Sequence, residues 1–208
     1  MKLIAISQRV DIVKSYGERR DGLDQKWAEF IIKLGGAPLP LPNINGINVD
    51  EYLSRLQLDG IVLTGGNDIV DGVNLSTNPA PERDNFERFL FNYAVKNKLP
   101  VLAVCRGMQF VNFLLGGKNT PVDGHIATRH KISLLVDDLA LPKDVNSFHG
   151  FGVKRENLAS SLKALATSDD DFVEAYRSTT DNILGLMWHP EREEPFKQLD
   201  IDLIKAHF

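Results

Sequence analysis

The sequence predicts an α/β fold with three layers, a mostly parallel central sheet and helices on both faces. Short apolar segments alternate with amphipathic ones through the first half of the chain, a pattern typical of parallel strands joined by crossover helices. The 208 residues, of which 43% are hydrophobic and 25% charged, are enough for one domain with a sizeable core. No Gly-, Ser- or Pro-rich linker divides them, so we expect a single domain over residues 1–208.

Four extended segments are expected in the first half of the chain. Two of them, KLIAIS (2–7) and LPVLAV (99–104), are short and apolar, as buried strands are. DGIVLTGG (59–66) is an apolar strand that ends in paired glycines, and the prolines of APLPLPN (37–43) exclude helix there.

Helices are expected between and after these strands. Apolar residues recur at helical spacing over 23–34, which Gly-Gly follows, and over 81–98, where a proline stands in the first turn. EYLSRLQL (51–58) and MQFVNFLLGG (108–117) complete the set.

The second half changes character. Four shorter strands with polar turns between them are expected, followed by a helix over 195–208; the strands are ISLLV (132–136), VNSFHG (145–150), FVEAYR (172–177) and ILGLMWH (183–189).

Charge and cysteine content exclude several classes of function. A net charge of −4, from 24 basic and 28 acidic residues, gives no reason to expect nucleic acid or a membrane as a partner. One cysteine cannot form an internal disulfide, and MKLIAISQRV lacks the pattern of a signal peptide. We therefore expect a cytoplasmic protein.

The single cysteine, Cys105, stands where a strand should end and a helix should begin. A sharp turn of this kind is the geometry of a nucleophile elbow, which needs a small residue such as Gly107 beside the nucleophile. The helix N-terminus favours the thiolate, and the backbone N–H of Arg106 points toward the same space. Taken alone, a lone cysteine is more often a small core residue, so that alternative stays open here.

A thiolate nucleophile needs a proton shuttle, and LGLMWHPERE (184–193) offers His189 with Glu191 two residues later. In an extended segment these side chains point the same way, so the carboxylate can orient the imidazole ring. LTGG (63–66) is a second strand end, where Gly66 offers another backbone N–H for an oxyanion. Each motif alone also fits an ordinary turn.

Together the three motifs, in the order LTGG, VCRGMQ and WHPE, resemble the class I glutamine amidotransferase-like superfamily, whose fold is flavodoxin-like. Further motifs resemble its γ-glutamyl hydrolase branch, the free-standing enzymes related to γ-glutamyl-γ-aminobutyrate hydrolase; they are AISQRV, GGAPLPLPN, TGGND, PERDNFE, CRGMQFVN and VNSFHG.

The resemblance implies a Cys105–His189–Glu191 catalytic triad and an oxyanion hole made by the N–H groups of Gly66 and Arg106. The implied reaction is hydrolysis of a γ-glutamyl amide-type bond through a glutamyl thioester. Neither a cofactor nor a metal is expected, because the histidines and acids show no metal-ligand spacing such as H-E-x-x-H.

The same resemblance implies substrate-binding residues. Gln109 helps to seat the γ-glutamyl group, Ser147 and His149 lie near its α-amino and α-carboxylate groups, and Glu174 is an acidic residue near the active site.

Three departures leave the leaving group open. Ala103 stands where the family usually has glycine, and Gly150-Phe151 follows NSFH where relatives have His-Gln. DIVKSYGERRDG (11–22) carries Arg19 and Arg20, which form either a solvated loop or a basic lid over an anionic, phosphate-bearing leaving group.

Other functions remain open at this point. They are a hydrolase of the γ-glutamyl-γ-aminobutyrate type, a glutaminase subunit that supplies ammonia to a synthase partner, and a non-catalytic protein of the same fold. The expected partner is a small-molecule γ-glutamyl substrate, and a homodimer is one candidate for the oligomeric state.

Overall fold

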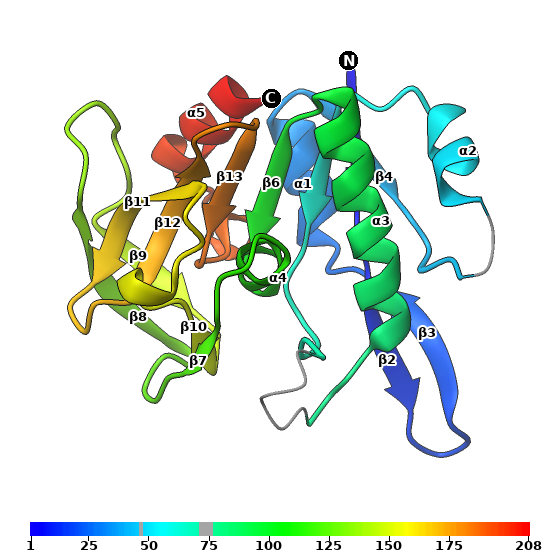
Figure 1. The fold of residues 1–208 in the computed structure, drawn as a ribbon, viewed down its shortest axis with the longest axis horizontal. Helices are drawn as coiled ribbons and strands as arrows, with labels where there is room; N and C mark the ends of the chain where they lie inside the picture. The colour runs from blue at the N-terminus through cyan, green and yellow to red at the C-terminus, as the bar shows by residue number, and fades with distance from the viewer. Residues whose placement is uncertain (46–47, 71–76) are drawn as a thin grey trace.

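A computed structural model describes residues 1–45, 48–70 and 77–208 of the chain. Its centre is a nine-stranded sheet with the order β4-β1-β5-β6-β13-β12-β11-β8-β9 (Figure 1). In that order the strands are Gly36–Pro40, Lys2–Ile6, Gly60–Leu63, Val101–Val104, Ile183–Leu186, Val173–Ser178, Leu162–Ser168, Thr128–Leu134 and Asp144–Ser147.

The first five strands in this order run parallel, and the other four continue the sheet in antiparallel pairs. Because β1 lies between β4 and β5, the direction of winding reverses beside β1. Ligands of open α/β sheets bind at the carboxyl ends of the strands near such a reversal. The strands predicted at 2–7, 59–66 and 99–104 are confirmed as β1, β5 and β6, and they are neighbours in the sheet.

Helices cover both faces of the sheet, as predicted. α1 (Lys26–Lys33) and α5 (Gln198–His207) pack on one face, and α2 (Val49–Ser54), α3 (Pro81–Asn97) and α4 (Arg106–Leu114) pack on the other (Figure 1). Alternate side chains of each strand enter the two layers. The three-layer α/β prediction is confirmed.

Two small hairpin-like pairs lie outside the main sheet. β2 (Arg9–Val13) pairs with β3 (Glu18–Gly22), and β7 (Thr120–Pro121) pairs with β10 (Phe151–Gly152). Both lie at the end of the molecule toward which β6 points (Figure 1). The charged side chains of 11–22 predict a solvated loop or a basic lid there; the segment forms most of the β2–β3 hairpin instead. Strand β11 was also missed.

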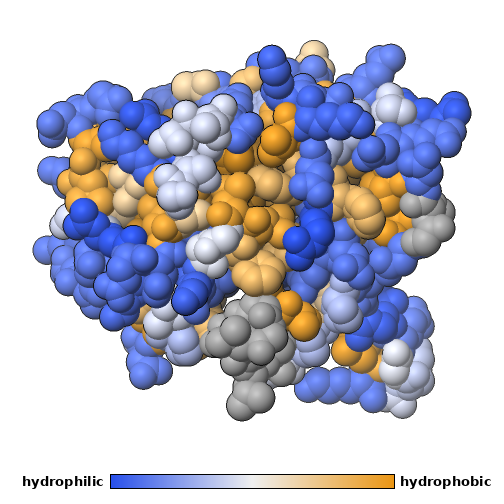
Figure 2. Space-filling model, in the orientation of Figure 1, coloured by the Kyte–Doolittle hydropathy of each residue, from blue (hydrophilic) through white to orange (hydrophobic). Residues whose placement is uncertain are grey.

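Apolar side chains gather near α4 on the face that carries α2, α3 and α4, and hydrophilic side chains surround them (Figure 2). Among the described residues, no helix has both the length and the apolar character needed to span a bilayer.

Candidate active site

Cys105 occupies the turn between β6 and α4 in a strained conformation, with φ 52° and ψ −109°. Its N–H donates to the carbonyl oxygen of Leu186 at 2.8 Å, and its carbonyl accepts from the N–H of Gln109 at 3.1 Å. A non-glycine residue held at positive φ costs free energy and is common at functional sites. The predicted strand–turn–helix at Cys105 is present.

Two glycines allow the backbone to approach this turn closely. A Cβ on Gly107 would lie 2.2 Å from the carbonyl oxygen of Leu63, so only glycine fits between α4 and β5. A Cβ on Gly65 would lie 2.7 Å from Cε1 of His189 and 3.5 Å from Cβ of Cys105. The imidazole and the cysteine therefore meet against the bare backbone of Gly65.

His189 and Glu191 form the polar half of the site. His189 Nδ1 lies 2.7 Å from Oε1 of Glu191, and both side chains are buried. Burial alone would lower the pKa of His189, but the charges of Glu191 and Cys105 and hydrogen bonds to both raise it to about 9. The imidazole is thus poised to hold a proton beside the thiol.

The backbone between these two residues differs from the expectation. Glu191 lies in a 3₁₀ turn, η2 (Pro190–Arg192), rather than in an extended segment. The turn still brings the carboxylate to Nδ1 of His189, because His189 itself has an extended conformation.

Asn146 on β9 fixes the backbone of His189 from both sides. Its Oδ1 accepts from the His189 N–H at 2.9 Å, and its Nδ2 donates to the His189 carbonyl at 2.8 Å. Sequence reasoning missed this residue, although VNSFHG contains it. The signal is visible only in space, because 43 residues separate the partners.

Arg83 on α3 holds the LTGG turn. Its guanidinium donates to the carbonyl oxygens of Thr64, Gly65 and Gly66 at 2.7, 3.0 and 2.5 Å. Within the described residues, the N–H groups of Gly66 and Arg106 have no hydrogen-bond acceptor in the protein. Both remain available to a ligand, although the oxyanion hole itself stays a prediction.

The side chain of Arg106 has a separate structural role. Its guanidinium pairs with Asp84 and Glu87 on α3, and Arg83 bonds to Glu87 at 2.8 Å. Buried charges are stable only when they are paired in this way. The network ties the nucleophile's helix to α3 and explains the charges of PERDNFE, whose role was not evident from the linear motif.

Gln109, Ser147 and His149 lie together around β10. Gln109 Nε2 donates to the carbonyl of Phe151 at 2.7 Å, and Nδ1 of His149 bonds to the same oxygen at 2.8 Å. The Ser147 hydroxyl donates to the carbonyl of His125 at 2.7 Å. The structure thus brings the three predicted residues to one side of the site, each with a side-chain polar atom already hydrogen-bonded.

Glu174 on β12 is buried without a hydrogen bond to either carboxylate oxygen. Burial raises its pKa to about 8, with smaller contributions from Asp170 and Cys105. It faces a cluster of three histidines, His125, His130 and His149. Linear spacing did not reveal this cluster, because its members come from separate segments of the second half.

Arg19 and Arg20 lie on the exposed hairpin rather than beside the triad. Arg19 pairs with Glu82 at 2.5 Å, and Arg20 pairs with Glu18 at 2.7 Å. Two other arginines, Arg9 and Arg192, line a hollow of about 20 Å³ beside the triad, and neither was singled out from the sequence. The other residues that line this hollow are Gly22, Leu23, Asp24, Trp27, Thr64, Gly65, Gly66, His189 and Glu191.

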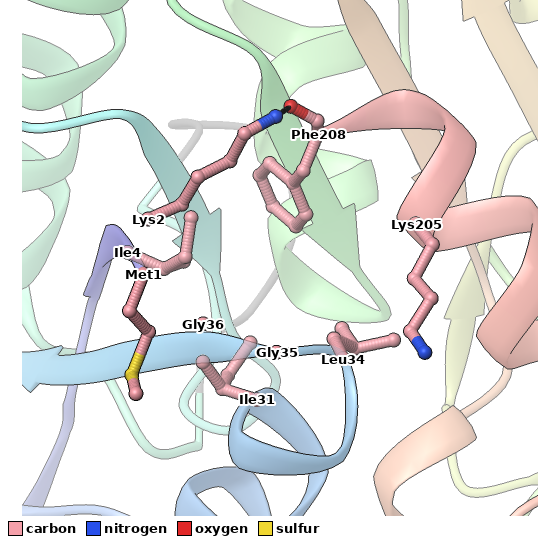
Figure 3. A pocket seen from close by; sticks show the side chains of 9 residues that line it. All are labelled: Met1, Lys2, Ile4, Ile31, Leu34, Gly35, Gly36, Lys205 and Phe208. Atoms are coloured by element: carbon pink, nitrogen blue, oxygen red, sulfur yellow. Dashed lines mark hydrogen bonds between the residues drawn. The ribbon is translucent and has the colours of Figure 1, made fainter.

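A larger pocket of about 300 Å³ lies at the other end of the parallel strands, where β1 and β4 begin (Figure 3). Apolar side chains such as Ile4, Ile31 and Phe208 line it, and Lys205 reaches its rim. No residue of the triad borders it, so its size does not mark the reactive centre.

Comparisons with known proteins agree with the fold and with the predicted family. γ-Glutamyl-CDP-amidate hydrolase of Campylobacter jejuni is 29% identical over 95% of this chain and 94% of its own length. γ-Glutamyl-γ-aminobutyrate hydrolase of Escherichia coli O157:H7 is 31% identical over 84% of this chain and 80% of its own length. The resemblance to the γ-glutamyl hydrolase branch is thereby confirmed.

A Thermoplasma acidophilum protein described as a GMP synthase component shares the fold, with a TM-score of 0.72 at 20% identity over 100% of this chain and 92% of that one. The family model described as Peptidase C26 matches residues 2–191. A match over this much of the sequence assigns the protein to a family of hydrolases: the chain belongs to the Peptidase C26 family.

Proposed function

We propose that the protein hydrolyses a γ-glutamyl amide-type bond, with Cys105 as the nucleophile. The observation that carries the proposal is the relay in which the buried Glu191 carboxylate lies 2.7 Å from His189 and the imidazole bonds to the cysteine. An orienting acid, a proton-carrying imidazole and a thiol on an elbow are the parts that acyl transfer to cysteine needs.

In the proposed reaction the Cys105 thiolate attacks the γ-carbonyl carbon of the substrate. The N–H groups of Gly66 and Arg106 hold the oxyanion of the tetrahedral intermediate. Protonated His189, oriented by Glu191, gives its proton to the departing nitrogen, and a glutamyl thioester stays on the cysteine. Water, deprotonated by the neutral imidazole, then attacks the thioester and releases glutamate.

The glutamyl group is proposed to bind toward β10. Gln109 lies one helical turn from Cys105 and seats the glutamyl chain. Ser147, His149 and Glu174 define the side of the pocket near its α-amino and α-carboxylate groups. These three side chains are buried, and Ser147 and His149 already bond to the backbone carbonyls of His125 and Phe151, so the three act by shaping the pocket.

For the leaving group we propose a nucleotide phosphoramidate, as in γ-glutamyl-CDP-amidate, which would yield cytidine diphosphoramidate for capsule biosynthesis. The relative that covers 95% of the chain supports this choice, and so do Arg9 and Arg192 beside the triad. Arg19 and Arg20 on the hairpin would form the outer part of a basic lid.

γ-Glutamyl-γ-aminobutyrate is the second candidate substrate, favoured by the relative from Escherichia coli. In both cases we propose a cytoplasmic enzyme that acts on a small molecule without a cofactor. A homodimer is compatible with either substrate.

Glutamate release from a panel of γ-glutamyl conjugates tests the proposal. The panel holds glutamine, γ-glutamyl-γ-aminobutyrate, an alkylamine conjugate, a folate polyglutamate and a nucleotide phosphoramidate conjugate. We expect the nucleotide compound to have the highest kcat/KM, and Arg9→Gln to reduce that preference. Equal rates for charged and neutral leaving groups would remove the nucleotide assignment but keep the hydrolase.

Cys105→Ala tests the chemistry itself. We expect turnover to fall by at least about 10³-fold with the fold retained, because the thioester cannot form. His207→Gln is a matched control, since that histidine lies on α5 and bonds to the carbonyl of Val101. Near-wild-type turnover in Cys105→Ala, with a normal circular dichroism spectrum, would refute the mechanism.

A further inference from the structure

Three histidines and one glutamate converge beside the active site from four places in the fold. His125 precedes β8, His130 lies on β8, His149 follows β9, and Glu174 lies on β12. Each offers a nitrogen or oxygen atom, and these four atoms all lie within 4.8 Å of one another. Nothing in the proposed hydrolysis requires so many imidazoles at one point.

The spacing of these atoms approaches that of the corners of a metal coordination tetrahedron. Nδ1 of His125 lies 3.3 Å from Nε2 of His149, and Oε1 of Glu174 lies 3.6 Å from Nε2 of His130 and 3.8 Å from Nε2 of His149. Four ligands at the usual Zn–N and Zn–O lengths of about 2.0–2.1 Å would stand about 3.3–3.4 Å apart.

The remaining nitrogen of each ring faces an oxygen acceptor. His125 Nε2 lies 3.1 Å from the Asp170 carboxylate, His149 Nδ1 lies 2.8 Å from the carbonyl of Phe151, and His130 Nδ1 lies 3.4 Å from that of Lys131. Metal-bound histidines almost always donate their second N–H in this way, which turns the other lone pair toward the ion.

Two features are unfavourable unless a cation binds. In neutral rings with these tautomers, the lone pairs of His125 Nδ1 and His149 Nε2 face each other at 3.3 Å. Nε2 of His130 and both carboxylate oxygens of Glu174 are buried without a hydrogen-bond partner. Unpaired buried polar atoms are costly, and a cation among them would satisfy the three imidazole nitrogens and one carboxylate oxygen of Glu174 at once.

We propose that His125, His130, His149 and Glu174 bind one divalent transition-metal ion, of which zinc is the best match. Three imidazoles and a carboxylate form a donor set that binds zinc in preference to calcium or magnesium, which favour oxygen ligands. The four protein ligands close the coordination shell, so the ion is structural and has no position for substrate or water. The sequence predicts no metal, because the histidines and acids show no metal-ligand spacing along the chain; the proposed site differs from that expectation.

The ion would stabilise one wall of the active site. It would link β8, the β9–β10 turn and β12, and β9 carries Asn146, which holds the backbone of His189. Phe148, beside the ligand His149, packs edge-on against the His189 ring with 5.8 Å between centroids. None of the reacting groups belongs to the metal site, but two of its ligands, His149 and Glu174, also border the proposed glutamyl pocket.

The test begins with full-length protein that has been treated with a chelator and then dialysed. Zinc chloride is titrated by calorimetry, and cobalt chloride by visible absorption. We expect about one equivalent of zinc to bind, a higher unfolding temperature after binding, and the intense visible bands of tetrahedral cobalt. Zinc binding that is absent, or that is unsaturable and leaves the unfolding temperature unchanged, would overturn the proposal.

Matched histidine variants locate the ion. His130→Ala should weaken zinc binding by more than about tenfold, and Asp170→Asn by about 10–100-fold through the orientation of His125. His207→Ala and His189→Ala should bind zinc as the wild type does. Equal zinc affinity in His130→Ala and wild type would refute this ligand set. His189→Ala separates metal binding from hydrolysis, because we expect this variant to be inactive but still to bind zinc.

Discussion

Two buried histidines on the same side of the molecule have opposite acid–base character. His189 and His149 are 2% and 3% exposed. Burial alone would lower the pKa of both, yet that of His189 is raised to about 9 and that of His149 is lowered to about 3. Burial therefore does not decide whether an imidazole in this protein carries a proton.

The partners of each ring decide whether the effect of burial is offset, as in His189, or left to prevail, as in His149. His189 has a carboxylate at 2.7 Å on one nitrogen and a thiol on the other, and both favour the imidazolium form. His149 has a backbone carbonyl on one nitrogen and another histidine on the other. The first environment suits a proton donor, whereas the second presents a lone pair.

Glu191→Gln tests this comparison most severely, because it leaves His189 buried and removes the partner that offsets burial. We expect kcat to fall by about 10²–10⁴-fold, as it does when the orienting acid of a triad becomes an amide. The pKa of His189 should also fall, so the alkaline limb of the kcat/KM profile should move to lower pH.

An unchanged pH profile in Glu191→Gln would mean that another group sets the charge of His189. Glu193→Gln is the control, since that carboxylate bonds to Asn146 and Arg129 rather than to the imidazole.

The pH dependence of stability should report the same charge. The folded-state pKa of His189 lies above the unfolded value of 6.5, so its contribution is complete below about pH 6.5 and is lost as the pH rises through about 9. The difference in unfolding free energy between wild type and His189→Gln should therefore shrink by on the order of 3 kcal/mol between about pH 6 and pH 10. Denaturant titrations in parallel buffers measure it, and a difference independent of pH would contradict the raised pKa.

Local chemistry explains what the sequence could predict of the two histidine sites. A buried strand, a lone cysteine and a following glycine lie within seven residues, so the elbow at Cys105 was predictable from short-range sterics. His189 and Glu191 are two residues apart, and even the wrong backbone assignment led to the correct contact.

The rest of the site depends on distances that a linear motif does not contain. Asn146 reaches His189 across 43 residues, and Arg83 reaches the LTGG turn across 17 to 19. The histidine cluster assembles only when β8, β9 and β12 pair in one sheet, which H-E-x-x-H spacing does not anticipate. Most of the fold follows from apolar periodicity, but the polar hairpin at 11–22 does not show that pattern.

Gly65→Ala should displace His189 without changing its partners. The added methyl would lie 2.7 Å from Cε1 of the imidazole, so the ring must move away from Cys105. We expect kcat to fall by about 10–10²-fold, because a small misplacement of a catalytic group has effects of this size. Gly150→Ala is the matched control, since its methyl meets only Ile126 at 3.6 Å. Equal steady-state rates for both variants would show that the His189 ring can accommodate the added methyl without losing its catalytic position.

A third histidine provides the mildest test. His207 on α5 lies outside both sites, and its pKa is lowered to about 4 by burial, partly offset by the carbonyl of Val101. Because this folded-state value lies below 6.5, the unfolded chain binds more protons between about pH 6.5 and pH 4, and stability falls as the pH falls through that range. His207→Gln should remove about 1–2 kcal/mol of that loss, a modest value because solvent still reaches the ring.

Unfolding curves at about pH 6.5 and pH 4.5 give the comparison. A wild-type slope in His207→Gln would mean that burial without a charged partner is too weak to discharge a histidine here, and that His149 owes its low pKa to the neighbouring imidazoles instead.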